Sequence, residues 1–133
     1  MFNLIKIENA RMNVPEPVFH EATASEAIAI GEALKLSSGK LTKCTATDKP
    51  EFIAIGQVGA SDANRKVAVC RVESNQVYEV PVTAAPTSLK VGDKVTLDTD
   101  GLRVTATTTS GVVTIESLNG ATAAGDTIVV RII

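Results

Sequence analysis

The chain has 133 residues, of which 44% are hydrophobic and 21% are charged, and its formal net charge is −2. This length suits a single domain with a buried core, and the composition is too apolar for a disordered chain. The small negative charge excludes the basic surface that binds nucleic acids or anionic membranes, and no apolar run reaches the length of a membrane-spanning helix. The N-terminus has no basic head followed by an apolar run, so we expect a protein made and assembled inside a cell.

The first 24 residues differ from the rest of the chain. The apolar stretch FNLIKI leads into Pro15 and Pro17, and these prolines disfavour both a helix and a central strand. We therefore expect an extended N-terminal arm over residues 1–24, followed by a folded β-domain over residues 25–133. The alternative is that the arm folds back as the first strand of that domain.

The predicted arm carries large apolar side chains, which soluble monomers rarely leave in water. An extended apolar segment suits strand addition to the sheet edge of a neighbouring subunit, and several arms in one oligomer reinforce one another. The predicted partner-binding residues are Phe2, Leu4, Ile5, Ile7, Val14 and Phe19.

From about residue 26, short runs of alternating apolar residues are separated by turn residues, which predicts a sandwich or barrel and not βαβ units. Gly39 and Gly101 supply the positive φ that tight hairpins need. Residues 25–36 have a helical alternative with Ser25 as N-cap, but their alternation and Gly31 favour a strand with a bend. The expected strands cover residues 26–36, 40–45, 51–58, 66–73, 76–82, 93–98, 102–108, 112–117 and 126–132.

One phrase occurs three times: a glycine, an acidic residue, a spacer and then alternating apolar residues. The copies are GEALKL from residue 31, GDKVTL from residue 92 and GDTIVV from residue 125. We interpret each copy as a corner at which glycine permits the turn, the acidic residue faces water and the apolar residues face the core. The uneven spacing of the copies excludes a solenoid.

Residues that carry reactive chemistry are few and scattered. Cys44 and Cys70 have no CxxC spacing, and we expect reduced core cysteines, with a bridge between them as the alternative. His20 is the only histidine, and Asp98 and Asp100 resemble a calcium loop only faintly, because no bidentate glutamate follows at the right spacing. We predict no catalytic residue, no cofactor and no metal site.

The order of the phrases carries a resemblance to a known family. The run GEALKLSSGKLTKCTATDKPEFIAIGQV, followed by VAVCRVESNQVYEVPV and LKVGDKVTLDTDGL, resembles the small head decoration (cement) proteins of tailed bacteriophages over about residues 25–133. The resemblance implies an all-β subunit, a small β-barrel or β-tulip with an N-terminal arm. It also implies a homotrimer on the capsid exterior that binds major capsid proteins by adhesion, without enzyme activity, cofactor, small-molecule substrate, nucleic acid or membrane.

Two further functions are alternatives. The chain could be another structural part of the virion, such as a head-fibre base or a tail-tube subunit. A carbohydrate-binding β-module is less favoured, because such modules present aromatic rings to sugars and this chain has only Phe2, Phe19, Phe52 and Tyr78.

Overall fold

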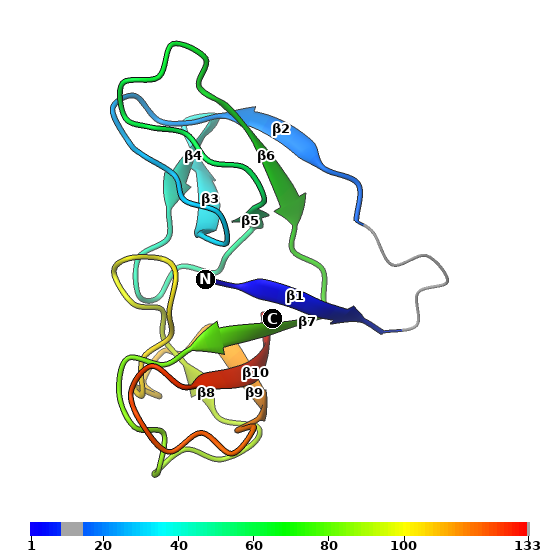
Figure 1. Ribbon diagram of the computed structural model, residues 1–133, viewed down its shortest axis with the longest axis vertical. Helices are drawn as coiled ribbons and strands as arrows, with labels where there is room; N and C mark the ends of the chain where they lie inside the picture. The colour runs from blue at the N-terminus through cyan, green and yellow to red at the C-terminus, as the bar shows by residue number, and fades with distance from the viewer. Residues whose placement is uncertain (9–14, 133) are drawn as a thin grey trace.

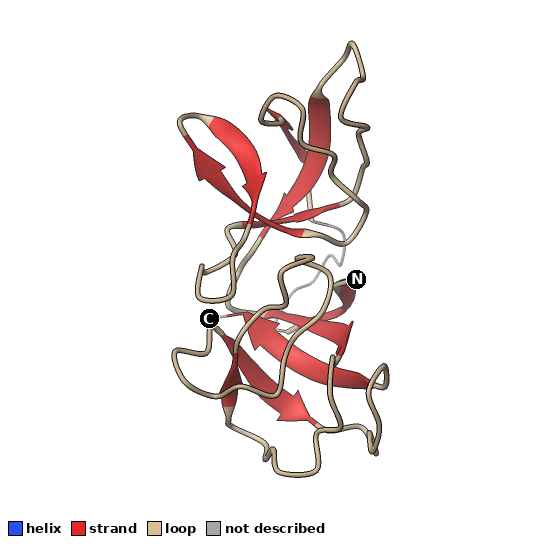
Figure 2. Cartoon of the chain, turned by 90° about the vertical axis from the view of Figure 1, so that its left-hand side faces the viewer, coloured by secondary structure: helices blue, strands red, loops and turns tan. Residues whose placement is uncertain are grey.

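A computed structural model gives the structure of the chain and describes residues 1–8 and 15–132. In these residues ten strands form two antiparallel five-stranded sheets, with no helix between them (Figures 1 and 2), which confirms the all-β prediction. No helix within the described ranges is therefore long and apolar enough to cross a membrane.

The two sheets occupy the two halves of the molecule. The first sheet, in the lower half of Figure 1, has the strand order β1 (Asn3–Ile7), β7 (Gln76–Pro81), β10 (Thr127–Ile132), β9 (Val113–Ser117) and β8 (Lys94–Val95). The second sheet, in the upper half, has the order β2 (Val18–Glu21), β6 (Lys66–Arg71), β5 (Phe52–Ala54), β3 (Ala33–Ser37) and β4 (Lys40–Lys43). In the sequence, all strands of the second sheet therefore lie between β1 and β7. In the structure, β1 and β7 are paired neighbours in the first sheet.

Neither sheet closes into a barrel, which corrects the predicted closed barrel. In the second sheet the two edges meet only at a single parallel bridge between Ala22 and Leu41. In the first sheet the edge strand β8 has two residues, and Val104 forms isolated bridges to Val82 and Leu97. A closed barrel requires a continuous ladder of paired residues, and each of these bridges pairs only one residue with another.

Two described parts of the expected extended arm over residues 1–24, which are residues 3–7 and 18–21, form paired strands, and residues 9–14 lie outside the described residues. Strand β1 pairs with β7 from Asn3 opposite Glu79 to Ile7 opposite Gln76, with an irregularity between Leu4 and Lys6. Strand β2 pairs with all of residues 66–69 of β6. Pro17 directly precedes β2 and no proline lies within β1, so the prolines did not prevent either strand from pairing. Residues 3–7 instead follow the alternative prediction, because they form a strand that folds back onto the domain.

Two hydrophobic cores lie on either side of the second sheet. Along β5 the side chains alternate: Phe52 and Ala54 belong to one core, and Ile53 belongs to the other. The second-sheet core contains Ala22, Ile28, Leu34, Leu41, Phe52, Ala54, Val58, Val67 and Val69. The larger core fills the first-sheet half and reaches across the seam through Ala33, Cys44 and Ile53. The seam between the halves is therefore packed with apolar side chains.

The three copies of the repeated phrase form the same kind of turn. Their glycines have φ values of 80°, 92° and 90° at Gly31, Gly92 and Gly125. The acidic side chain does not simply face water as predicted; its carboxylate accepts the backbone N–H three positions earlier, which satisfies a donor of the turn. These bonds join Ala29 to Glu32 at 2.8 Å, Lys90 to Asp93 at 2.8 Å and Ala123 to Asp126 at 3.0 Å.

Most predicted strands are present, although several are shorter than expected. The strand expected over residues 26–36 begins only at Ala33, after the bend at Gly31, and no helix forms there. The strand expected over residues 102–108 is reduced to the bridges of Val104. Gly39 and Gly101 have positive φ values of 78° and 69°, as the hairpin interpretation predicted.

Candidate functional site

The structure separates the predicted partner-binding residues. Phe2 is buried in the larger core, where its ring meets that of Tyr78 edge-on at 6.1 Å. Leu4 is half-buried against the same core and Ile7 is also half-buried, whereas Ile5 is exposed. Phe19 is the most exposed of the set, at 63%. Val14 lies outside the described residues.

Phe19 begins a row of apolar side chains on the outer face of the second sheet. It lies directly opposite Ala68 of β6, and the carbonyl of Ala68 accepts the N–H of Ile55 at 3.0 Å and that of Gly56 at 3.0 Å. Directly paired residues point to the same face of a sheet, and the flanking Val67 and Val69 point to the opposite, core side. Phe19, Ala68 and Ile55 therefore form one continuous outward row across β2, β6 and the end of β5.

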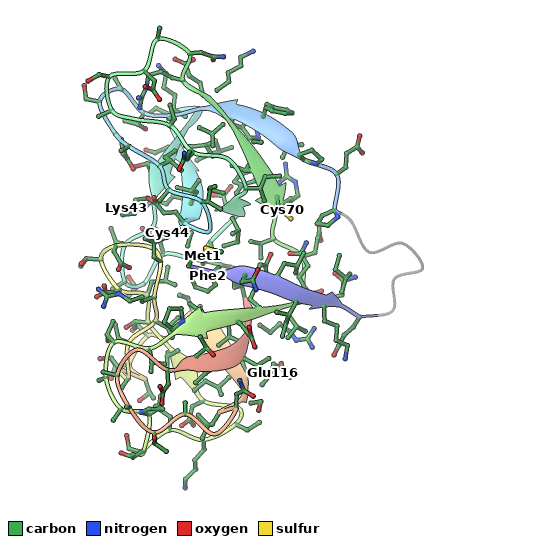
Figure 3. All side chains as sticks on the ribbon, viewed as in Figure 1. Met1, Phe2, Lys43, Cys44, Cys70 and Glu116 are labelled. Atoms are coloured by element: carbon green, nitrogen blue, oxygen red, sulfur yellow. The ribbon has the colours of Figure 1, made fainter. Side chains whose placement is uncertain are left out.

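This row leads into an apolar groove at the seam. The groove has a volume of about 320 Å³ and includes Ile55 in its wall, together with the exposed side chains of Met1 and Ile30. Phe2 and Tyr78, both buried, also line it, and Figure 3 shows Met1 and Phe2 at the junction of the two halves. We call the row and the rim together the apolar surface, defined by Met1, Phe19, Ile30, Ile55 and Ala68.

Local backbone structure holds the rim of the groove in place. Gly31 adopts a φ of 80°, and its carbonyl accepts the N–H of Phe2 at 2.9 Å while its own N–H donates to Ala54 at 2.7 Å. A Cβ at this position would overlap the side chain of Met1. The glycine thus lets the N-terminal residues cross closely over the turn that presents Ile30.

The chemistry of the groove suits adhesion. No side chain in its lining carries a formal charge. Burial raises the pKa of Cys70, which lies in the wall, and burial also raises the pKa of Tyr78. Cys44 lies deeper, and burial raises its pKa to about 12, so its thiolate is scarce at neutral pH. These groups offer contact area and no activated nucleophile.

The remaining candidate residues occupy structural positions. His20 lies against the ring of Phe52, with ring centroids 5.1 Å apart. Asp98 and Asp100 both accept hydrogen bonds from Arg103, at 2.9 and 2.7 Å, within one turn. Across residues 1–8 and 15–132, no group of three or more His, Cys, Asp or Glu side chains is placed to hold a metal ion. Cys44 and Cys70 are both free thiols.

No protein family model matches the chain, and no curated protein matches it either.

Sequence reasoning missed four of the five residues of the apolar surface, which are Met1, Ile30, Ile55 and Ala68. Ile30 and Ile55 were assigned to strands whose apolar side chains were expected in the core. The available signal was the uninterrupted apolar run FIAI at residues 52–55, because a strand apolar on both faces is typical of burial on both sides or of a contact surface. Each of the two isoleucines also precedes a glycine, where regular alternation ends.

Proposed function

We propose that this protein is a structural component of a tailed-bacteriophage head, which decorates the capsid exterior by binding major capsid proteins through the apolar surface. The observation that carries the proposal is this surface itself: Phe19 is 63% exposed, Met1 51%, Ile55 47% and Ile30 46%. Contiguous exposed apolar side chains on a soluble protein mark a site of interaction.

The size of the apolar surface favours a partner with many equivalent sites. The largest apolar patch on a typical soluble monomer covers on the order of 300–600 Å². A stable interface needs about 800 Å² from each partner, so one such patch gives a weak contact. Copies arrayed on a repeating shell, or joined in an oligomer, bind much more tightly because each bound contact raises the effective concentration of the next.

Two further parts of the proposal come from the resemblance in the order of phrases over residues 25–133. The protein acts as a homotrimer on the mature shell, and its fold is related to the β-tulip of decoration proteins. Two bridges support the second part: Ala22–Leu41 joins the two edges of the second sheet, and Val82–Val104 joins the segment after β7 to the segment after β8. The exposed Ile5 and half-buried Leu4 and Ile7 stay predicted secondary contacts.

A direct test is density-gradient separation of phage particles from the source lysate, with quantification of this protein in each fraction. The proposal expects many copies on full heads and far fewer on unexpanded precursors. Copies that follow tails, or a purified protein that polymerises into stacked rings, would instead indicate a tail-tube subunit or a head-fibre base. Absence from all particles would overturn the proposal.

The role of the apolar surface is tested with paired variants. Phe19→Ser combined with Ile55→Ser should abolish binding to undecorated heads while the protein stays folded, because both side chains are exposed. The matched control is Val91→Ser, since Val91 is 64% exposed but lies outside the apolar surface. Equal binding by the double variant and the control would exclude this surface as the contact.

The carbohydrate-binding alternative receives less support from the structure. Phe2, Phe52 and Tyr78 are buried, so Phe19 is the one aromatic side chain of the chain that is broadly exposed. A sugar-binding platform needs aromatic faces open to the ligand. Binding to a glycan array that Phe19→Ser abolishes would nevertheless favour this function over capsid decoration.

A further inference from the structure

A second pocket, distinct from the apolar groove, lies between the two halves and is charged. Its volume is about 650 Å³, and its walls come from the segment before β3, the loop at residues 57–62 and the hairpin at residues 98–103. Four charged side chains line it, which are Glu32, Lys43, Asp62 and Asp100. Figure 3 shows Lys43 at the level where the halves meet.

Glu32 is the unusual member of this group. Its side chain is 3% exposed, and its Oε2 atom accepts the backbone N–H of Ala29 at 2.8 Å. Its other oxygen, Oε1, is buried and has no hydrogen-bond partner. The nearest cationic atom is Lys43 Nζ at 3.9 Å, beyond hydrogen-bonding distance, on a side chain that is 39% exposed. A buried acceptor without a donor is a strong place for a ligand to gain binding energy.

The neighbouring carboxylates already have partners. Asp62 accepts the N–H of Gly59 at 2.6 Å. Asp100 accepts the N–H of Leu102 at 2.8 Å and the Nε of Arg103 at 2.7 Å. Glu32 Oε1 is therefore the buried acceptor of the pocket that stays open, in a lining with three carboxylates and one lysine.

The geometry decides which cation fits this acceptor. A guanidinium prefers two parallel acceptors, but at Glu32 it would have to share Oε2 with the N–H of Ala29. A divalent metal needs several oxygen or nitrogen ligands, and the described residues provide no such cluster. A primary ammonium is a compact charge that needs only one strong acceptor and tolerates water at its other donors.

We propose that this pocket binds a primary ammonium group through Glu32 Oε1, supplied either by a lysine side chain of a partner protein or by a small free amine. Lys43 is then a competitor, because its own ammonium lies beside the same oxygen. The proposal requires only the isolated chain and does not depend on the capsid role.

Protonation of Glu32 controls such binding. Burial raises the pKa of Glu32, while the N–H of Ala29 and then Lys43 lower it; the negative charges of Glu26 and Asp100 raise it further. An ammonium beside Oε1 favours the ionised form, so the pKa of Glu32 falls when the ligand binds, and binding is lost on acidification. The charged groups around the pocket are Glu26, Lys43, Asp62, Arg65, Asp100 and Arg103.

The test is an NMR titration of the full chain that follows the Glu32 carboxyl carbon and the Ala29 amide. The probes are propylamine and the peptide acetyl-Gly-Lys-Gly-amide, with acetyl-Gly-norleucine-Gly-amide as the neutral control. A saturable shift with a lysine peptide indicates a protein partner, and one with propylamine alone indicates a small amine; both support the site. An equal shift with the norleucine peptide overturns it.

Variants separate the site from general electrostatics. Glu32→Gln keeps an oxygen for the Ala29 N–H and should abolish amine binding, whereas Glu16→Gln removes an exposed carboxylate and should leave it unchanged. Lys43→Met should strengthen binding several-fold because the competing ammonium is gone. If Glu32→Gln does not fold, the titration of Lys43→Met tests the site, because stronger amine binding by this variant supports it. No saturable shift in either the wild-type protein or Lys43→Met overturns the proposal.

Discussion

Strands β1 and β2 both come from the N-terminal segment and both lie at the edge of a sheet, yet they present their aromatic side chains in opposite ways. Phe2, just before β1, is 2% exposed, whereas Phe19 in β2 is 63% exposed. The difference teaches that the apolar content of an edge segment does not reveal whether it anchors the fold or displays a contact surface. The side chains available on the neighbouring strand decide that.

The contacts of each strand explain the difference. Phe2 meets the ring of Tyr78 on the neighbouring strand β7, and the residue that follows β1, Glu8, pairs with Arg131 at 2.8 Å. In β2, Val18 packs toward the second-sheet core and His20 lies against the Phe52 ring. Because alternate residues of a strand face opposite sides, Phe19 must then point outward.

The largest expected effect comes from truncating the two phenylalanines in turn. Phe2→Ala should lower the free energy of unfolding by about 3–5 kcal/mol, because it leaves a cavity against Tyr78. Phe19→Ala removes an exposed side chain and should change stability by no more than about 0.5 kcal/mol. Urea denaturation measures both values. Similar losses from the two variants would show that β2 is as deeply anchored as β1.

Two glycines sharpen the comparison at the place where β1 begins. Gly31 and Gly39 have nearly equal φ values, 80° and 78°, but a Cβ at Gly31 would overlap Met1 whereas a Cβ at Gly39 would meet open space. Gly39→Ala should cost about 1 kcal/mol for the backbone conformation alone, and Gly31→Ala about 2–3 kcal/mol. Thermal unfolding compares them. Equal costs would mean that Met1 moves aside freely.

A smaller effect is expected from the ion pairs that hold the end of β1. Arg131 contacts Glu8 at 2.8 Å and Glu116 at 3.0 Å, and its side chain is 15% exposed. Arg131→Met should lower stability by about 1–2 kcal/mol. Hydrogen exchange should become faster in β1 and stay unchanged in β2. The control Arg103→Met breaks a pair in the hairpin at residues 98–103 and should leave β1 protected.

The smallest effect is a pH dependence confined to β1. Hydrogen bonds from Arg131, and then from Lys6, lower the pKa of Glu8 from its ordinary value of 4.5. A carboxylate with a lowered folded-state pKa contributes stability that is present above the unfolded value and is lost as pH falls through the folded value. As the pH falls below about 4.5, the amides of β1 should therefore lose protection relative to their intrinsic exchange rates before those of β2. The Arg131→Met variant should no longer show this difference.

The sequence predicts most of the regular strands well and the N-terminal strands β1 and β2 poorly. Alternating apolar residues located β4, β6, β7, β9 and β10. The partners of β1 could not be predicted, since Asn3 pairs with Glu79 more than seventy residues away and no local pattern encodes that contact. The strand predicted over residues 102–108 was wrong, because this segment pairs with other strands only at Val104.

The candidate site was predicted in part. Phe19 was singled out from its sequence and is exposed, although its partner remains a prediction. Phe2 was assigned the same role and is instead core, because its burial depends on Tyr78 and on the turn at Gly31. Ile30 and Ile55 lie at the ends of apolar runs, where alternation no longer specifies which face a side chain takes.

The insertion of the second sheet between β1 and β7 has a consequence for synthesis on the ribosome. Residues 18–71 contain every strand of the second sheet, so that half is able to assemble while the rest of the chain is still being made. Strand β1 must wait until residues 76–81 emerge, and β7 in turn awaits β10 at residues 127–132. Residues 2–7 thus leave the ribosome before the second sheet but are buried after it, and Phe2 spends that interval in water.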